Sequence, residues 1–148
     1  MQGSSRSIDP IMHYTFTIEQ GNFTDAGQAS SSVKRTLKQL GVDPANIKRT
    51  VVALYEAEIY AVAHAYGGTI DVDIDDGKIV MVVADQGPGI PNIDLAMQEG
   101  WSTASAKVRE MGYGAGMGLP NIKKNTDDLK IDTQIGVGTT LTMTVNLV

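Results

Sequence analysis

The chain has 148 residues, of which 42% are hydrophobic and 20% charged, and its formal net charge is −5. This length suits one compact domain with its own core, and this composition excludes a disordered chain. The acidic balance argues against nonspecific nucleic-acid binding, and the absence of cysteine excludes disulfides and thiolate metal sites. The chain shows neither an apolar run of membrane-spanning length nor a signal-peptide pattern, so we expect a cytoplasmic protein.

The N-terminal part predicts a flexible segment followed by a strand. Residues 1–12 include a polar, serine-rich run, and we expect the folded domain to span residues 13–148. From His13 to Glu19, apolar and polar residues alternate, which predicts a half-buried strand.

Two helices are predicted next. Apolar residues recur at helical spacing over Asp25–Leu40, and the pattern stops at Gly41. A longer helix starts at Asp43-Pro44, because aspartate caps free backbone N–H groups and proline suits the first turn. The apolar period of this second helix continues to Ala65.

A hairpin and a long loop occupy the middle of the chain. Thr69–Ile74 and Lys78–Ala84 flank Asp75-Asp76-Gly77, which is a strong hairpin signal. The second of these strands is continuously apolar after Lys78, so we expect it in the middle of a sheet and covered on both faces or nearly so. In the segment Asn92–Tyr113 we expect one short helical stretch and otherwise a loop. A last helix and two strands are predicted over Leu119–Thr126, Leu129–Gln134 and Thr139–Leu147.

This order of elements predicts an α+β fold. Strands joined by hairpins, with helices gathered in blocks, imply a two-layer sandwich with a mixed, mostly antiparallel sheet and helices on one face. No repeat and no second domain is apparent.

A glycine-rich run precedes the last predicted helix. Gly112, Gly114, Gly116 and Gly118 alternate with other residues. Such a backbone comes close to bulky anions, and the following helix offers free N–H groups, so the run predicts a phosphate cradle. By itself the run is more typical of a flexible hinge. Its spacing disfavours both the dinucleotide-binding and the P-loop patterns.

A second motif is Asp85-x-Gly87-x-Gly89, at the end of the apolar strand. A carboxylate there needs a partner, and the amine of a ligand is one candidate. The glycines would let a flat ring lie against the backbone. A tight turn with a capping aspartate explains the same residues equally well.

A third motif lies on the long helix. Glu56, Tyr60 and His64 are spaced four residues apart and share one face, whereas Glu58 points elsewhere. The flanking apolar positions place Glu56 near the edge of the core, where a carboxylate is costly unless it has a partner or a function. An ordinary solvated helix edge is the alternative interpretation.

Taken together and in this order, the three motifs resemble the N, G1 and G2 boxes of the Bergerat-fold (GHKL) ATPases. That superfamily includes sensor histidine kinases, DNA gyrase and the anti-sigma-factor serine kinases. The resemblance extends from Tyr14 to the C-terminus and includes a closing glycine element. The matching segments are Glu56–Gly68 (N box, in the form of the anti-sigma branch), Asp85–Ile90 (G1), Gly114–Ile122 (G2) and Gly136–Thr140.

The resemblance implies an ATP site. Asp85 would accept a hydrogen bond from the adenine amino group. Gly87, Gly89 and Ile90 would lie against the base, and Thr140 would support the adenine end. The phosphates would be held by the backbone of the glycine-rich run, at Gly112, Gly114, Ala115, Gly116, Met117, Gly118 and Leu119. Asn92–Tyr113 would form a mobile lid.

The resemblance also implies chemistry at the N box. Glu56 would act as the general base, and Tyr60 and His64 would lie at the nucleotide site. Tyr60 occupies the position of the family's Mg²⁺-binding asparagine. A phenol is a poor Mg²⁺ ligand, so this departure leaves both Mg²⁺ binding and turnover open.

Three functions follow from the resemblance. The first is an anti-sigma kinase that phosphorylates a serine on a STAS-type antagonist protein and binds a sigma factor. The second is a nucleotide-binding switch without turnover, and the third is the ATP-binding component of a split histidine kinase. For all three we expect binding of ATP or ADP and a homodimer, and neither nucleic acid nor membrane as a partner.

Overall fold

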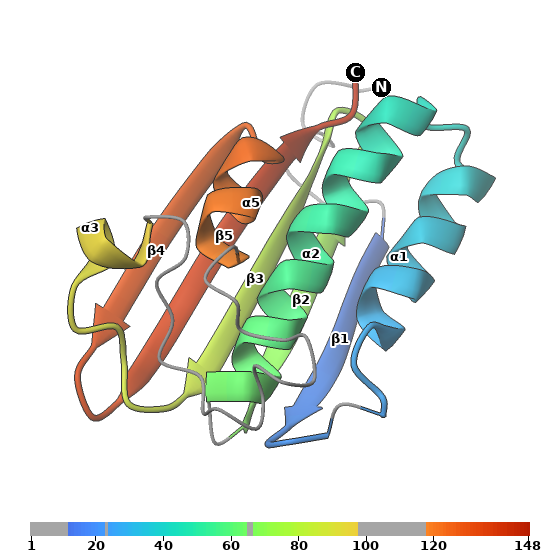
Figure 1. The fold of residues 1–148 in the computed structure, drawn as a ribbon. Coiled ribbons are helices and arrows are strands. Elements are labelled where there is room, and N and C mark those ends of the chain that lie inside the picture. Colours follow the sequence, from blue (N-terminus) through green and yellow to red (C-terminus); the bar gives the residue numbers. More distant parts are fainter. Residues whose placement is uncertain (1–11, 23, 65–66, 98–117) are drawn as a thin grey trace, which may run out of the picture.

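The computed structural model describes residues 12–22, 24–64, 67–97 and 118–148. In these residues five strands form one sheet in the order β1–β2–β3–β5–β4, and every neighbouring pair is antiparallel. Helices α1, α2 and α5 lie side by side on one face of this sheet (Figure 1). The predicted two-layer α+β fold is therefore confirmed, with a sheet that is antiparallel throughout.

The strands begin and end close to the predicted positions. β1 starts one residue earlier than expected, and β2 and β3 are longer because Gly67 and Gly68 pair with Gln86 and Asp85. The hairpin turn forms as predicted, since Asp75 Oδ1 accepts hydrogen bonds from the backbone N–H groups of Gly77 and Lys78. The strands are β1 (Met12–Glu19), β2 (Gly67–Ile74), β3 (Lys78–Gln86), β4 (Asp128–Gln134) and β5 (Gly138–Asn146).

β3 is the central strand, as its apolar sequence predicts, but the described helices cover only one of its faces. Ile79, Met81 and Val83 point toward the helices and are buried. Val80 and Val82 point to the opposite, open face and are half-buried. No described helix covers this second face, and the expected coverage of both faces stays a prediction.

Helix α1 (Gln28–Gln39) begins three residues later than the sequence predicts. Gly27 precedes it in a left-handed conformation, with φ 97°. The carboxylate of Glu58, on α2, accepts hydrogen bonds from the backbone N–H groups of Gly27, Ala29 and Ser30 at 3.0, 3.3 and 2.9 Å. Glu58 therefore caps α1, which explains why a carboxylate that is only 5% exposed is tolerated there.

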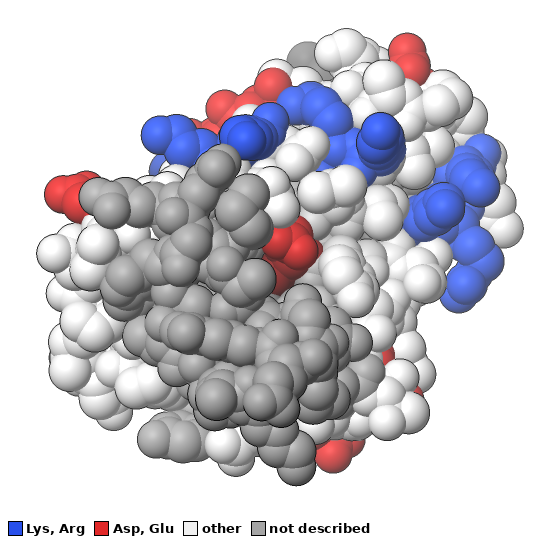
Figure 2. All heavy atoms as spheres, in the orientation of Figure 1, with Lys and Arg blue, Asp and Glu red and all other residues white. Residues whose placement is uncertain are grey.

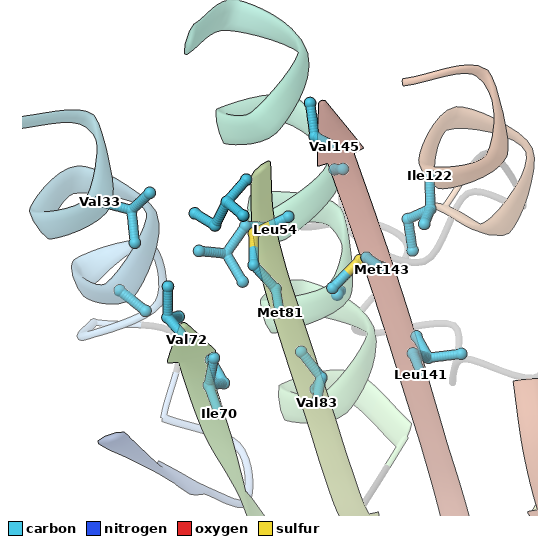
Figure 3. Close-up of a cluster of buried hydrophobic side chains, with 14 of the residues drawn as sticks. Val33, Leu54, Ile70, Val72, Met81, Val83, Ile122, Leu141, Met143 and Val145 are labelled. Carbon is cyan, nitrogen blue, oxygen red and sulfur yellow. The ribbon is translucent and has the colours of Figure 1, made fainter. Parts of the chain in front are cut away.

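Helix α2 (Pro44–His64) crosses the middle of the sheet. It starts as predicted, because Asp43 Oδ1 accepts a hydrogen bond from the N–H of Ala45. The small side chains of Ala53, Ala57 and Ala61 are fully buried and let the helix approach the strands closely. Figure 3 shows Leu54 in the core between this helix and the central strands, near Met81 and Met143.

Two short helices complete the described fold. α3 (Ile93–Ala96) is the predicted short helical stretch, and α5 (Gly118–Lys124) packs beside α2 with Leu119 and Ile122 buried. Neither of these helices nor any other described helix is long and apolar enough to cross a membrane.

Candidate functional site

Asp85 lies at the end of β3, with its side chain on the helix-covered face. Its Oδ1 accepts a hydrogen bond from the backbone N–H of Thr139 at 3.0 Å. Burial raises the pKa of Asp85, and the Thr139 bond opposes this only in part. No hydrogen bond from a described residue reaches Oδ2, so this oxygen can accept one from a ligand amine.

Glycines on the two neighbouring strands allow the backbone to approach Asp85 closely. Gly68 on β2 and Gly138 on β5 lie beside residues 84–86. A Cβ atom at Gly138 would overlap the carbonyl oxygen of Asp85, and one at Gly68 would overlap the carbonyl oxygen of Ala84. The close approach of these three strands therefore requires glycine at both positions.

The predicted G1 loop is anchored to the end of the β4–β5 hairpin. Ile90 donates its backbone N–H to Thr133 Oγ1 at 2.8 Å, and Thr133 and Thr139 share a hydroxyl hydrogen bond of 2.9 Å. Gly87 donates to the carbonyl of Val137. Gly89 has φ 81°, and a Cβ atom there would lie 2.7 Å from the oxygen of Gln134. These contacts join the loop to the β4–β5 hairpin beside Asp85.

Thr139, rather than Thr140, lies beside Asp85. Thr139 is 3% exposed and faces the helices. Thr140 is half-buried on the open face, where it pairs with Ala84 and Asp132. Neighbouring residues of a strand point to opposite faces. Sequence reasoning missed Thr133 and Thr139, and only the register of β5 against β3 and β4 identifies them.

Tyr60 lies on α2, near enough to Asp85 for the charge of the carboxylate to act on it. Burial raises the pKa of the Tyr60 phenol, and the negative charge of Asp85 raises it further. Tyr60 therefore stays a neutral phenol at physiological pH. This effect of Asp85 indicates that Tyr60 on α2 and Asp85 at the end of β3 are near each other.

Glu56 lies one turn before Tyr60 on the same side of α2 and is half-buried. Asn121, on α5, donates a hydrogen bond from Nδ2 to Glu56 Oε2 at 3.2 Å. The orientation of Glu56 on α2 therefore depends on a residue of another helix, α5. Sequence reasoning placed Asn121 in the G2 motif but gave it no role.

Several predicted residues cannot be placed. Gly112, Gly114, Ala115, Gly116 and Met117 lie outside the described residues, and so does the side chain of His64. Gly118 and Leu119 are described and form the first turn of α5, where Leu119 is buried.

At the position of the family's Mg²⁺-binding asparagine, the described residues offer only a poor ligand. No three histidine, aspartate or glutamate side chains gather into a metal-binding group in this part of the chain. Tyr60 occupies the position expected for the metal ligand, and its neutral phenol oxygen is a poor ligand for a hard cation. The acceptor atom of Asp85, in contrast, suits an adenine amine.

Comparison with known proteins decides the family. The model of the histidine kinase-like ATPase domain matches residues 21–145, which is most of the chain. The chain belongs to this family. The resemblance inferred from the motifs is therefore confirmed, and the family implies the use of ATP.

Relatives in this family include regulators and a kinase. The serine/threonine-protein kinase RsbT of Bacillus subtilis (strain 168) is 31% identical over 110 residues, covering 72% of this chain and 77% of that protein. An anti-sigma F factor of Thermoanaerobacter sp. (strain X514) is 30% identical over 142 residues, covering 90% of this chain and 95% of that protein.

Two solved structures share the histidine kinase-like fold. The RsbU and RsbW domains of Rv1364c from Mycobacterium tuberculosis match with a TM-score of 0.64 and 20% identity, over 93% of this chain and 33% of that one. The SiaB–SiaC complex from Pseudomonas aeruginosa matches with a TM-score of 0.58 and 14% identity, over 95% of this chain and 92% of that one. At these identities the similarity concerns the fold.

Proposed function

We propose that this protein is an ATP-binding anti-sigma regulator that phosphorylates a serine on a STAS-type antagonist protein and binds a sigma factor. The observation that carries the proposal is Asp85 at the end of β3: its Oδ2 receives no hydrogen bond from a described residue, and its charge acts on Tyr60 of α2. The similarity to an anti-sigma F factor and to a serine/threonine kinase supports the choice of partners. The proposal includes a homodimer and a cytoplasmic location.

The adenine end of the proposed site is built around Asp85. Its Oδ2 would accept the adenine amino hydrogen, while the Thr139 bond keeps the carboxylate in one orientation. Thr139 takes the supporting role that sequence reasoning gave to Thr140, because it shares the face of Asp85. Gly89 and Ile90 would lie against the base, held there by the Thr133 hydroxyl.

The proposed transfer step needs a base near the phosphate end. Glu56 would take the proton of the incoming serine hydroxyl as its oxygen attacks the terminal phosphorus and ADP leaves. Asn121 orients Glu56 through the 3.2 Å hydrogen bond. Residues 112–119 would grip the phosphates through backbone N–H groups, as the glycine-rich sequence predicts.

The test is transfer from labelled ATP, in the presence of Mg²⁺, to a purified STAS-type antagonist. We expect phosphoserine on the antagonist and a loss of about 10²- to 10⁴-fold in rate for Glu56→Gln. Tyr60→Asn restores the compact amide oxygen that suits Mg²⁺ and serves as the positive control. Transfer by Tyr60→Asn but none by the unaltered protein would contradict the kinase proposal.

Tyr60 favours a second candidate, a nucleotide-binding switch without turnover. A neutral, half-buried phenol at the metal position would let adenine bind at Asp85 while leaving the phosphates without a protein-held metal. This candidate predicts that the protein binds its partners normally but forms no phosphoserine on the antagonist. A loss of signalling in Glu56→Ala, with folding and nucleotide affinity unchanged, would exclude the switch.

A further inference from the structure

A groove lies between the C-terminal half of α1 and the N-terminal half of α2. It has a volume of about 480 Å³. Apolar residues from α2 and from the turn that precedes it form its floor, and three lysines form its rim. The lining residues are Val42, Pro44, Ile47, Val51 and Val52, with Lys34, Lys38 and Lys48.

The floor of this groove remains partly open to solvent. Val42, Val51 and Val52 are half-buried, whereas Ile47 is closed off at 6% exposure. Leu40, in the turn between the helices, is 42% exposed and adds apolar surface nearby. An open apolar strip bordered by charge is typical of protein interaction sites.

The rim carries positive charge on both walls. Lys34 and Lys38 lie one turn apart on α1, and Lys48 lies on α2. All three are exposed, and none forms an ion pair or hydrogen bond with another described residue. Figure 2 shows basic side chains over α1 and over the top of the molecule, with uncharged surface between them. This local charge is opposite in sign to the net charge of −5.

We propose that this lysine-rimmed groove docks an acidic amphipathic helix of a partner protein. An apolar groove between two helices accepts the apolar stripe of a third helix. Lysines on both walls would pair with carboxylates on both flanks of that helix. A single anionic head group would instead call for charges that converge on one point.

The groove is separate from the nucleotide site. Lys48 and Tyr60 are twelve residues apart on α2, which corresponds to about 18 Å along the helix axis. A helix docked in the groove therefore leaves the space around Asp85 open. The inference goes beyond the proposed function, and the two fail independently.

The test uses a fluorescein-labelled peptide designed as a helix, with leucines along one stripe and glutamates on both flanks. Fluorescence polarisation with the full chain should give saturable binding that weakens as salt rises. The double variant Lys34→Glu/Lys38→Glu should weaken binding at least about tenfold. A peptide with lysines in place of the glutamates should bind this variant better than it binds the unaltered protein.

Matched controls separate the groove from general charge. Lys78→Glu/Lys130→Glu changes the net charge equally, but both lysines lie on the open face of the sheet. This variant should bind the acidic peptide within about twofold of the unaltered protein. Asp85→Asn should also keep peptide binding even where it loses nucleotide binding, which distinguishes this proposal from the proposed function.

Three results would overturn the proposal. The first is no peptide binding up to about 1 mM protein. The second is equal weakening by the two double variants. The third is that the protein does not bind the peptide but binds phosphatidylglycerol vesicles, and that Lys34→Glu/Lys38→Glu abolishes the vesicle binding. This result would assign the groove to a membrane surface.

Discussion

Asn121 and Glu56, 65 residues apart in the chain, are joined by a hydrogen bond of 3.2 Å between Nδ2 and Oε2. The bond ties α5 to α2 at the carboxylate proposed as the general base. α5 directly follows the glycine-rich run predicted to hold phosphate. The same short helix thus connects the predicted phosphate cradle with the residue that would remove the proton.

Asn121→Ala should slow phosphoryl transfer while leaving nucleotide affinity unchanged. Without its donor, Glu56 samples unproductive rotamers, so we expect kcat to fall about 10- to 100-fold with KM for ATP constant. Steady-state kinetics separates the two constants. Asn146→Ala, which removes an exposed side chain at the end of β5, is the control. A rise in KM with unchanged kcat would mean that Asn121 binds nucleotide instead of positioning Glu56.

Asp85→Asn should stabilise the ligand-free protein at neutral pH and weaken ATP binding. Burial raises the folded-state pKa of Asp85 above its ordinary 3.8. The unaltered protein therefore loses stability as pH rises from 3.8 through the folded pKa, and asparagine avoids this loss. We expect a gain of under about 1 kcal/mol, because the carboxylate is only half-buried and solvent screens it.

Denaturant unfolding at several pH values measures this gain, which should disappear below pH 3.8, where both states are protonated. Calorimetry should show ATP binding at least about tenfold weaker, since a hydrogen bond to a charged acceptor is lost. Asp132→Asn, exposed on the open face of β4, is the matched control and should change neither quantity. Unaltered ATP affinity in Asp85→Asn would remove the basis of the proposed function.

Glu58→Ala should destabilise the fold without touching the nucleotide site. The substitution leaves the backbone N–H groups of Gly27, Ala29 and Ser30 without their acceptor. We expect a loss of roughly 2–4 kcal/mol in the free energy of unfolding. Urea denaturation measures it, and Glu19→Ala, exposed at the end of β1, supplies the comparison. Equal stability of the two variants would show that α1 needs no cap from α2.

The ion pair between Arg49 and Asp127 should contribute stability that acid removes. Arg49 lies 2.8 Å from Asp127 Oδ2, and the hydrogen bond from Arg49, with another from the N–H of Asn146, lowers the pKa of Asp127. A lowered pKa means that the contribution is complete above 3.8 and lost as pH falls through the folded value. A double-mutant cycle of Arg49→Ala and Asp127→Asn should give about 0.5 kcal/mol at pH 7 and a coupling that disappears once acid protonates Asp127 in the folded state. A coupling energy that does not change with pH would contradict this origin.

The sequence by itself determined the elements, their approximate bounds and the family. Helical and strand periods are local properties, so the alternation in β1 and the apolar run in β3 are visible without any partner. The Asp75 turn and the Asp43 cap depend on residues within three positions, and both formed as predicted. Asp85, Glu56 and Tyr60 are proposed as site residues because their motifs resemble those of the family and occur in the same order.

Only the tertiary structure decided which residues accompany them. Thr139 lies beside Asp85, with Thr140 on the other face, because β5 pairs with β3 in one register, and a shift of one residue would exchange the two. Asn121 reaches Glu56, and Glu58 caps α1, through contacts between helices that lie far apart in the chain. Such contacts depend on how the helices and strands pack against one another, and local sequence periodicity does not predict that packing.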